Sequence, residues 1–436
     1  MIKKDARDVA VSAITAFRKR SAWTDGFLRN EIRSCNLSPQ DAALATEIVN
    51  GVLQNMLLIN HYIKSFSSLR LNKISPGILD ILQMAVYQTI FLDRVPNSAA
   101  INDAVKRAKK NNPRAAGFVN AVARKISSQK NNLPEIKGNP AEILSVKYSH
   151  PLWLVEKFIS VYGAETAEKI LSANNEKTAI SVRVNTLKIS SNEFLQREAD
   201  FVAGIIPDSA YITNSRGIEK RDSFKNGEFQ VQDISSQLAA LTLAPKENSK
   251  VLDSCAAPGG KSFLMAQLMK NTGDIISCDI YPHKLELIKN RAETLGIKNI
   301  TVRLQNAAEF NAQFENAFDY VLTDVPCSGI GIIRKKPDIR YKDEEEIKML
   351  PELQLSILKN SARYVKQGGC LLYSTCTILP EENCEVVRKF LEENNSFVEE
   401  KEYFDIPCEE NLYGITLLPH LGRTDGFYMC KLRRIK

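Results

Sequence analysis

The chain has 436 residues, of which 44% are hydrophobic and 25% are charged. This length exceeds one ordinary hydrophobic core, so we expect two or three domains, and the composition is that of a soluble globular protein. The N-terminal sequence MIKKDARD lacks the apolar stretch of a secretory signal, and no run of 18 apolar residues occurs. We therefore expect a cytoplasmic protein that does not span a membrane.

The nine cysteines are odd in number, form no C-x-x-C pair, and all but Cys35 follow residue 250. A disulfide framework would spread its cysteines along the chain in even number, so reduced thiols are expected. The four histidines show no ligand spacing either. We expect no metal site.

The net charge of +7 is unevenly distributed. Residues 1–130 hold 20 Lys/Arg against 9 Asp/Glu, whereas residues 131–436 hold 38 against 42. A basic first third on a nearly neutral remainder indicates contact with a polyanion, although a solvated helical surface gives the same pattern.

Residues 5–130 have the periodicity of helices, with apolar side chains three and four residues apart, as at Ile78, Leu82 and Val86. The segment contains a dense basic run and a further basic pair, and their members are Lys106, Arg107, Lys109, Lys110, Arg114, Arg124 and Lys125. The polar stretch that follows contains Pro134 and Pro140, so residues 131–141 are predicted to be a linker.

Residues 142–235 mix helical and strand-like patterns, with an amphipathic stretch at 151–162 and a strand at 180–185, and are predicted to form a small lead-in subdomain. From residue 236 to 436, short apolar runs alternate with helical stretches. The runs lie at 250–254, 274–279, 300–304, 318–324 and 369–375. This alternation predicts an α/β domain with a doubly wound, mostly parallel sheet.

The first of these strands is followed by the turn Cys255, Ala256, Ala257, Pro258, Gly259, Gly260, and a helix is expected from about Lys261. In an open α/β sheet, ligands bind beyond the carboxyl ends of the strands. Glycines let the backbone approach a ligand, and a helix N-terminus attracts a carboxylate. Asp279 ends the next strand, where an acidic residue can bind a ribose diol.

Three other interpretations of this turn are open. A P-loop would need glycine where Cys255 stands, and a dinucleotide fingerprint would need G-x-G-x-x-G, so neither pattern is complete. A tight strand-to-helix turn with no ligand is the third.

Two cysteines follow strand ends on the same side of the predicted sheet. Cys327 comes after the strand that ends at Asp324, and Cys376 after the strand at 369–375, whereas Cys370 is expected to be packed within its strand. The C5 carbon of cytosine is a poor nucleophile, but addition of a thiolate to C6 turns it into an enamine-like carbon. A carboxylic acid at Asp324 would assist by giving a proton to N3. A second thiol would assist loss of the C5 proton and release. Position alone makes either cysteine the nucleophile.

Several motifs resemble those of RNA cytosine-C5 methyltransferases. They are DSCAAPGGK (253–261), TDVPCSG (323–329), IRKKPDIRY (333–341), YSTCTILPEEN (373–383) and PHLGRTDGFY (419–428). Upstream, SHPLWLV (149–155), VRVNTLK (182–188) and VQDISSQL (231–238) also match. Residues 1–130, with DAALATEIVNGVL (41–53) and RVPNSAAINDAVKRAKK (94–110), resemble the NusB-like RNA-binding domain. Together they are similar to bacterial 16S rRNA (cytosine-C5)-methyltransferases of the RsmB/Sun/Fmu kind.

The resemblance implies an all-α NusB-like domain followed by a Rossmann-like class I methyltransferase domain, S-adenosylmethionine as cofactor, small-subunit ribosomal RNA as partner, and a monomer. It makes Cys376 the nucleophile and Cys327 the residue that assists release. It places the cofactor on residues Cys255 through Lys261, Asp279, Lys284, Asn306 and Asp324.

Two positions depart from the pattern. Asn306 stands where an acidic residue is common, and an amide can still hydrogen-bond there. Lys284 replaces an arginine, so pairing with a carboxylate is expected to be looser.

The target base must be unstacked before a thiol can reach it. Arg334, Lys335, Lys336 and Arg340 follow the Cys327 turn, and we expect them to grip phosphates near that base. The competing functions are a transfer RNA methyltransferase with the same chemistry and an RNA-binding factor with a dead methyltransferase fold. Both thiols, Asp324 and an intact glycine turn argue against the latter.

Overall fold

The computed structural model describes residues 4–19, 24–401 and 404–436, which divide into two compact units. The first unit contains the described residues up to Asn175 together with Ile333–Lys342, and the second contains Glu176–Ile332 and Asp343–Lys436. Each unit is considered by itself below. The domain bounds predicted from the sequence stay predictions.

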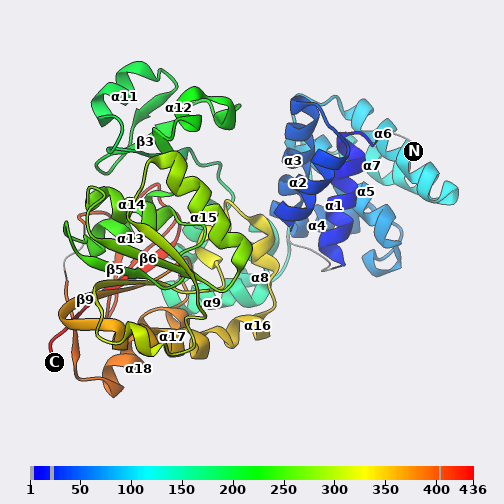
Figure 1. Cartoon of the computed structure of the whole chain (residues 1–436). Helices are drawn as coiled ribbons and strands as arrows, with labels where there is room; N and C mark the ends of the chain where they lie inside the picture. Colours follow the sequence, from blue (N-terminus) through cyan, green and yellow to red (C-terminus); the bar gives the residue numbers. More distant parts are fainter. Residues whose placement is uncertain (1–3, 20–23, 402–403) are drawn as a thin grey trace. The chain divides into compact units, whose positions relative to one another are not determined.

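The first unit is entirely helical (Figure 1). Its helices are α1 (Ala6–Arg18), α2 (Thr24–Ser34), α3 (Pro39–Gln54), α4 (Met56–Phe66), α5 (Pro76–Phe91), α6 (Asn97–Asn111), α7 (Ala116–Ser128), α8 (Pro140–Tyr148), α9 (Leu152–Tyr162) and α10 (Ala164–Ala173). Short 3₁₀ turns are η1 (Leu71–Lys73), η2 (Pro113–Ala115) and η6 (Pro337–Tyr341). The helical prediction for residues 5–130 is confirmed.

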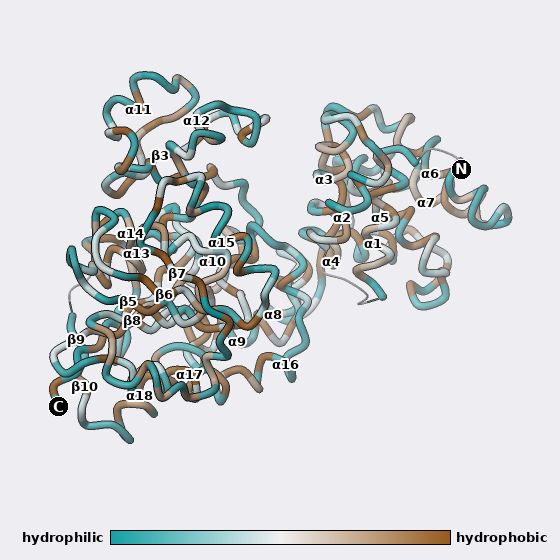
Figure 2. Tube along the Cα trace, in the orientation of Figure 1, coloured by the Kyte–Doolittle hydropathy of each residue, from teal (hydrophilic) through white to brown (hydrophobic). Residues whose placement is uncertain are grey.

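Helix α5 is the centre of this unit because it is apolar on nearly all sides. Its residues 78–89 are all buried, and α1, α3, α4, α6 and α7 contact it. A helix that is hydrophobic all round must be surrounded by others, whereas the covering helices alternate hydrophobic and hydrophilic residues (Figure 2). Among the described residues no single helix is long and apolar enough to cross a membrane. Helices α3 and α4 pass that test only as a pair bent by 77°.

The second unit begins with a small antiparallel sheet in the strand order β2-β3-β1-β4. Its elements are β1 (Ile180–Val184), α11 (Ser191–Arg197), β2 (Phe201–Ala203), β3 (Ser209–Ile212), η3 (Ile218–Lys220), α12 (Asp222–Lys225) and β4 (Phe229–Val231). Phe194, Phe201 and Phe229 pack together in its core, with ring centroids 5.0 to 5.7 Å apart.

The large sheet follows, with the strand order β11-β12-β13-β9-β8-β5-β6-β7 and with β10 paired to β13. Its elements up to the last parallel strand are α13 (Ile234–Leu243), β5 (Lys250–Asp253), α14 (Gly260–Leu268), β6 (Asp274–Asp279), α15 (Pro282–Leu295), β7 (Ile300–Leu304), η4 (Ala312–Phe314), β8 (Phe318–Asp324), η5 (Ile330–Ile332), α16 (Glu344–Lys348), α17 (Leu350–Tyr364) and β9 (Val365–Thr375). The remainder are η7 (Pro380–Glu382), α18 (Cys384–Glu393), β10 (Phe397–Glu399), β11 (Glu409–Glu410), β12 (Ile415–Leu417) and β13 (Phe427–Arg434).

Strands β5 to β9 are parallel, as the alternating pattern predicts, and helices cover both faces. Helices α13, α14 and α15 pack on one face, and α17 and α18 pack on the other (Figure 1). The strand order reverses beside β5, since β6 and β7 lie on one side of it and β8 and β9 on the other. Ligands in such sheets bind at this reversal, beyond the strand ends at Asp253 and Asp324.

The last strands form an antiparallel extension that the sequence patterns did not predict. β13 pairs with β9 over six residue pairs, from Tyr428 opposite Thr375 to Arg433 opposite Cys370. It therefore covers the side of β9 that would otherwise be a sheet edge. Cys370 is 3% exposed within β9, as expected for a packed cysteine.

Candidate active site

The turn after β5 is shaped by Gly259. Its φ is +102°, and a Cβ added there would lie 2.5 Å from Cζ of Phe263, so only glycine fits without a shift. The amide of Ala256 donates to the Cys278 carbonyl at 2.8 Å and anchors the turn to β6. Helix α14 begins at Gly260, directly after the turn. The first amides of that helix have no acceptor within it, which suits an anionic group.

Asp253 stabilises the start of α14 by a buried hydrogen bond, a role that the sequence analysis did not predict. It is 1% exposed, and its Oδ2 accepts a hydrogen bond from the Ser262 hydroxyl at 2.6 Å. Burial raises the pKa of Asp253 to about 7. The sequence did not indicate this role, because Asp253 ends an apolar strand next to the turn and nothing in that pattern shows that its side chain faces the core.

Asp279 ends β6 and Asn306 follows the end of β7, and these neighbouring strands are in register at Asp279 and Leu304. Lys284 lies in the first turn of α15. Asp279 accepts from the Tyr281 amide at 3.0 Å, and the Lys284 ammonium lies 3.8 Å from the same carboxylate oxygen. That separation fits the loose pairing expected of a lysine. Asn306 is exposed and uses its amide locally, accepting from Ala308 and donating to Glu309.

Asp324 is held by two partners at the end of β8. The Lys261 ammonium lies 2.6 Å from Oδ2, and the Ser374 hydroxyl donates to Oδ1 at 2.8 Å. Burial favours a neutral lysine, but attraction to Asp324 outweighs it and raises the pKa of Lys261. The first turn of α14 is thereby joined to the ends of β8 and β9.

The two predicted thiols meet. The sulfurs of Cys327 and Cys376 are 3.1 Å apart, and both residues are half-buried. The parallel register of β8 and β9 sets Asp324 opposite Ser374, so the turns that follow lie side by side. A hydrogen bond from the Gly331 amide to the Cys376 carbonyl, 3.0 Å long, joins them.

The thiol pair is asymmetric in charge. A hydrogen bond from Cys327 is the largest effect on Cys376 and lowers its pKa, despite opposing burial and the Asp324 charge. The same hydrogen bond, burial and nearby carboxylates raise the pKa of Cys327. The arrangement favours a thiolate at Cys376 that accepts a hydrogen bond from a Cys327 thiol.

One expectation about the basic loop is wrong. Arg340 is fully buried within the first unit, where its guanidinium donates to Gln54, Tyr148 and Ser149 carbonyls at 2.9 to 3.2 Å and to Asn175 Oδ1 at 3.0 Å. Because the residue is 0% exposed, its guanidinium cannot reach an RNA phosphate near a flipped base. Lys335 and Lys336 are exposed, and Arg334 is half-buried.

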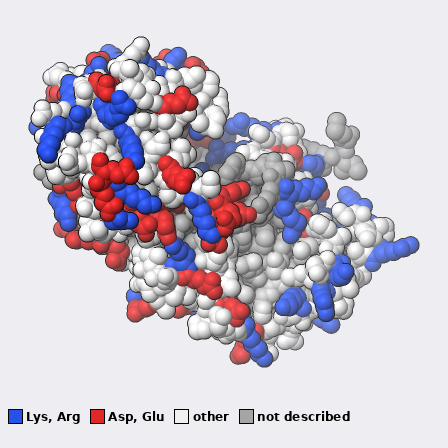
Figure 3. Space-filling model, turned by 90° about the horizontal axis from the view of Figure 1, so that it is seen from below, with Lys and Arg blue, Asp and Glu red and all other residues white. Residues whose placement is uncertain are grey.

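Arg107 is a second correction, within the basic run of α6. Its guanidinium is bound by the carboxylates of Asp5, Asp8 and Asp103, and the residue is 9% exposed. It therefore fixes α1 against α6 and does not face a polyanion. The other residues of the run are exposed, namely Lys106, Lys109, Lys110 and Arg114. The basic residues of α7, Arg124 and Lys125, are exposed as well. Figure 3 shows one face on which Lys and Arg gather on the helical unit with few acidic residues among them.

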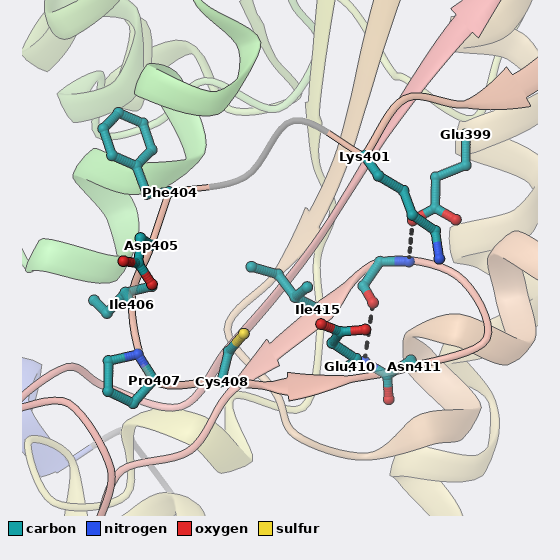
Figure 4. Close-up of a pocket in the computed structure, with 11 residues that line it drawn as sticks. Glu399, Lys401, Phe404, Asp405, Ile406, Pro407, Cys408, Glu410, Asn411 and Ile415 are labelled. Atoms are coloured by element: carbon teal, nitrogen blue, oxygen red, sulfur yellow. Dashed lines mark hydrogen bonds between the residues drawn. The ribbon is translucent and has the colours of Figure 1, made fainter.

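A pocket of about 530 Å³ lies elsewhere in the second unit, lined by side chains between Glu399 and Ile415 (Figure 4). Phe404 and Asp405 stand on one side of it and Lys401 on the other. None of the residues predicted for the cofactor or for catalysis lines this pocket, so it has no part in the site described above.

Comparison with known proteins gives consistent matches along the chain. The family model described as 16S rRNA methyltransferase RsmB/F matches residues 240–433, and the NusB family model matches residues 4–128. A model of the ferredoxin-like domain of RsmF/B-like methyltransferases matches residues 150–203. Each match falls on a part of the chain whose fold is described above.

Curated relatives and one solved structure match over nearly the whole length, and a second solved structure matches over about two thirds of it. A probable ribosomal RNA small subunit methyltransferase B of Bacillus subtilis is 37% identical over 100% of both chains, and one of Synechocystis is 30% identical over 98% of this chain and 99% of its own. The crystal structure of PH0851 is 27% identical, covers 98% of both chains and has a TM-score of 0.80. A methyltransferase homologue from Pyrococcus horikoshii is 26% identical, covers 68% of this chain and 100% of its own, with a TM-score of 0.61. The chain therefore belongs to the RsmB/F family of 16S rRNA methyltransferases.

Proposed function

We propose that the protein transfers a methyl group from S-adenosylmethionine to C5 of a specific cytosine in 16S ribosomal RNA, through a covalent bond between Cys376 and C6 of the base. The observation that carries the proposal is the pair of sulfurs 3.1 Å apart at the carboxyl ends of β8 and β9, next to Asp324. The names of its relatives support a small-subunit ribosomal RNA substrate.

The turn from Cys255 to Lys261 is proposed to hold the cofactor, with Asp279, Lys284, Asn306 and Asp324. The residues fit it in two respects. The start of α14, directly after the turn at Gly259, suits a carboxylate. The Asp279 carboxylate suits a ribose diol. When bound, S-adenosylmethionine supplies an electrophilic methyl group.

In the first step, the Cys376 thiolate adds to C6 of the cytosine and its electron pair forms the new S–C bond. The C5=C6 electrons move to C5, which becomes the carbon that takes the methyl group. The Cys327 thiol, which donates a hydrogen bond to Cys376 before attack, is free to move to the base once the sulfur is bonded to C6.

Asp324 and Lys261 are proposed to control the proton at N3. Negative charge reaches N3 as the thiolate adds, and a proton delivered there stabilises the adduct. The ammonium nitrogen of Lys261 lies 2.6 Å from the carboxylate oxygen, so Lys261 can supply the proton that Asp324 passes to N3.

After transfer, the C5 proton must leave so that the C5=C6 bond can form again and expel Cys376. Cys327, directly or through water, is proposed to take part in this proton removal. Because Cys327 enters this step as a thiol, it first gives its own proton to water. The Cys327 thiolate then takes the C5 proton, the C5–H electrons form the C5=C6 bond, and Cys376 leaves C6 as a thiolate.

The first 130 residues are proposed to capture the RNA through the exposed lysines and arginines of α6 and α7, because phosphate contacts supply most of the affinity for nucleic acid. The target cytosine must be unstacked before it reaches Cys376. The cytoplasmic location and monomeric state stay predictions.

The proposal is tested by incubating the purified protein with S-adenosylmethionine and with either 16S ribosomal RNA or transfer RNA, followed by bisulfite sequencing. One protected cytosine in 16S RNA is expected. A methyl group found at another atom, or in transfer RNA alone, would contradict the proposed substrate.

A further inference from the structure

Glu382 is a carboxylate that the fold buries completely beside the two thiol turns. It is 0% exposed, ends the short helix η7, and forms an ion pair with no Lys or Arg among the described residues. Oε2 accepts hydrogen bonds from the Ser328 amide at 2.8 Å and from the Gln354 side chain at 2.9 Å. Oε1 is buried and, within the described part of the chain, has no hydrogen-bond partner. Burying a charge in this way is costly, so its retention calls for an explanation.

Glu382 and Gln354 together hold both sides of Cys327. Gln354 donates to the Pro326 carbonyl at 3.0 Å as well as to Glu382, and Glu382 accepts from the Ser328 amide. The residues before and after Cys327 are thereby attached to one carboxylate–amide pair. The backbone of Glu382 is itself fixed, because the Tyr373 hydroxyl donates to its carbonyl at 2.6 Å.

The charge of Glu382 also acts on the thiols. After the hydrogen bond to Cys376 and burial, the negative charges of Cys376, Glu382 and Asp324 raise the pKa of Cys327 further. Cys376 feels the same carboxylates, yet its pKa is lowered because it accepts the hydrogen bond that Cys327 donates. A fixed negative charge behind the Cys327 turn therefore keeps the proton on Cys327.

We propose that Glu382 is a positioning residue that holds Cys327 as a protonated thiol against the sulfur of Cys376, and so assigns attack to Cys376 and release to Cys327. The assignment of these two steps rests on the proposed function. Gln354 shares the positioning but carries no charge, which allows placement and charge to be separated by experiment.

The first test uses the free protein and does not depend on RNA chemistry. Alkylation by iodoacetamide is followed at each cysteine by mass spectrometry from pH 6 to 10. In the native chain, Cys376 should react at lower pH than Cys327. Glu382→Gln should bring the Cys327 midpoint down by about one pH unit, a tenfold change in its thiolate fraction. Gln354→Met keeps the Glu382 charge and should lower that midpoint by less than Glu382→Gln does. Glu392→Gln, a control on the exposed face of α18, should leave the midpoint in place.

The second test uses 16S RNA and a denaturing gel. Both Glu382→Gln and Gln354→Met should accumulate the covalent protein–RNA adduct, because a misplaced Cys327 slows release, and Glu392→Gln should not. Thermal unfolding of each variant checks that the fold is retained; if Glu382→Gln unfolds, Glu382→Asp takes its place.

An unchanged Cys327 midpoint in folded Glu382→Gln, or adduct levels equal to the native chain in both variants, would overturn the role of Glu382. Failure of the proposed function looks different. The native chain would then form no methylated RNA and Cys376→Ala would change nothing, while the alkylation midpoints would still report on Glu382.

Discussion

The ammonium of Lys261 lies 2.6 Å from a carboxylate oxygen of Asp324, although the two residues come from different elements. Lys261 stands in the first turn of α14, directly after the glycine turn, and Asp324 ends β8. The Ser374 hydroxyl of β9 holds the other oxygen. The proposed cofactor turn and the proposed base-binding carboxylate are therefore parts of one hydrogen-bonded group, and a change at Lys261 should be felt in the chemistry.

Replacing Lys261 by methionine should slow methyl transfer at saturating cofactor by about 100-fold, since the proton supply to Asp324 is removed. Single-turnover transfer of labelled methyl to RNA measures this rate. Lys284→Met is the matched control, because Lys284 pairs with Asp279 instead. It should weaken cofactor binding without changing the saturated rate. Equal rates for both variants would rule out a proton role for Lys261.

Cys376→Ala should abolish transfer of labelled methyl, because no other described thiol lies at the end of β9 to attack C6. Circular dichroism should show an unchanged fold, since the residue is half-buried in a turn. Cys370→Ala, a packed cysteine of the same strand, serves as control and should keep its activity. Turnover retained by Cys376→Ala would refute the nucleophile assignment.

Cys327→Ala should leave attack by Cys376 possible but impair release, so a covalent protein–RNA adduct should accumulate on a denaturing gel. Removal of the Cys327 hydrogen bond should also raise the pKa of Cys376, because that bond is the main effect lowering it. Alkylation of Cys376 should then need a higher pH than in the native chain. No adduct in Cys327→Ala, with an adduct in Cys376→Ala, would reverse the two roles.

Asp253 should make stability depend on pH. Its folded pKa of about 7 lies above the value of an unfolded aspartate, so the folded state binds the proton more tightly. This difference in pKa adds at most roughly 4 kcal/mol to the free energy of unfolding at pH 4, and the contribution is lost as the pH rises towards 7. Urea unfolding at pH 5 and pH 8 measures the difference. Asp253→Asn should reduce that difference, and an unaltered pH dependence would contradict the prediction.

Reversing the charge of Lys109 and Lys110 should weaken RNA capture. The slope of log affinity against log salt should fall by about two, because each lysine that is reversed leaves one RNA phosphate without its cation. Filter binding at several salt concentrations gives the slope. Lys169→Glu, on the exposed face of α10 in the same unit, is the control and should have no such effect. Cofactor binding should be unchanged in all three proteins. If the salt slope of the Lys109 and Lys110 double variant equals that of the native chain, RNA does not bind at these lysines.

The strand pattern of the second unit was predictable because short apolar runs bounded by turns mark buried parallel strands. β6 (Asp274–Asp279), β7 and β8 lie where those runs predict them. The pattern also placed Asp324, Cys327 and Cys376 at one edge of the sheet, since parallel strands end on the same side. The family resemblance was needed to rank the two cysteines, and that order stays a prediction.

Burial of charged residues was not predictable in this way. Arg340 and Arg107 stand in basic runs, but each has partners from distant parts of the chain, such as the Gln54 carbonyl for Arg340 and the Asp5 carboxylate for Arg107. Glu382 likewise follows a similar glutamate in the sequence, and nothing in that pair tells which one faces the core. A local sequence pattern shows which side chains are charged, but it does not show which of them contact each other in the folded chain.

The membership of Ile333–Lys342 in the first unit has a consequence for how the protein can be divided. The chain passes between the two units three times, so a single cut cannot separate them. A truncation that begins after Asn175 would leave Ile339 and Arg340 without the surroundings that bury them. For the same reason, if the NusB-like part were fused to a methyltransferase that lacks Ile333–Lys342, the positions that Ile339 and Arg340 occupy in the first unit would be empty. The two parts must therefore be engineered as a matched pair.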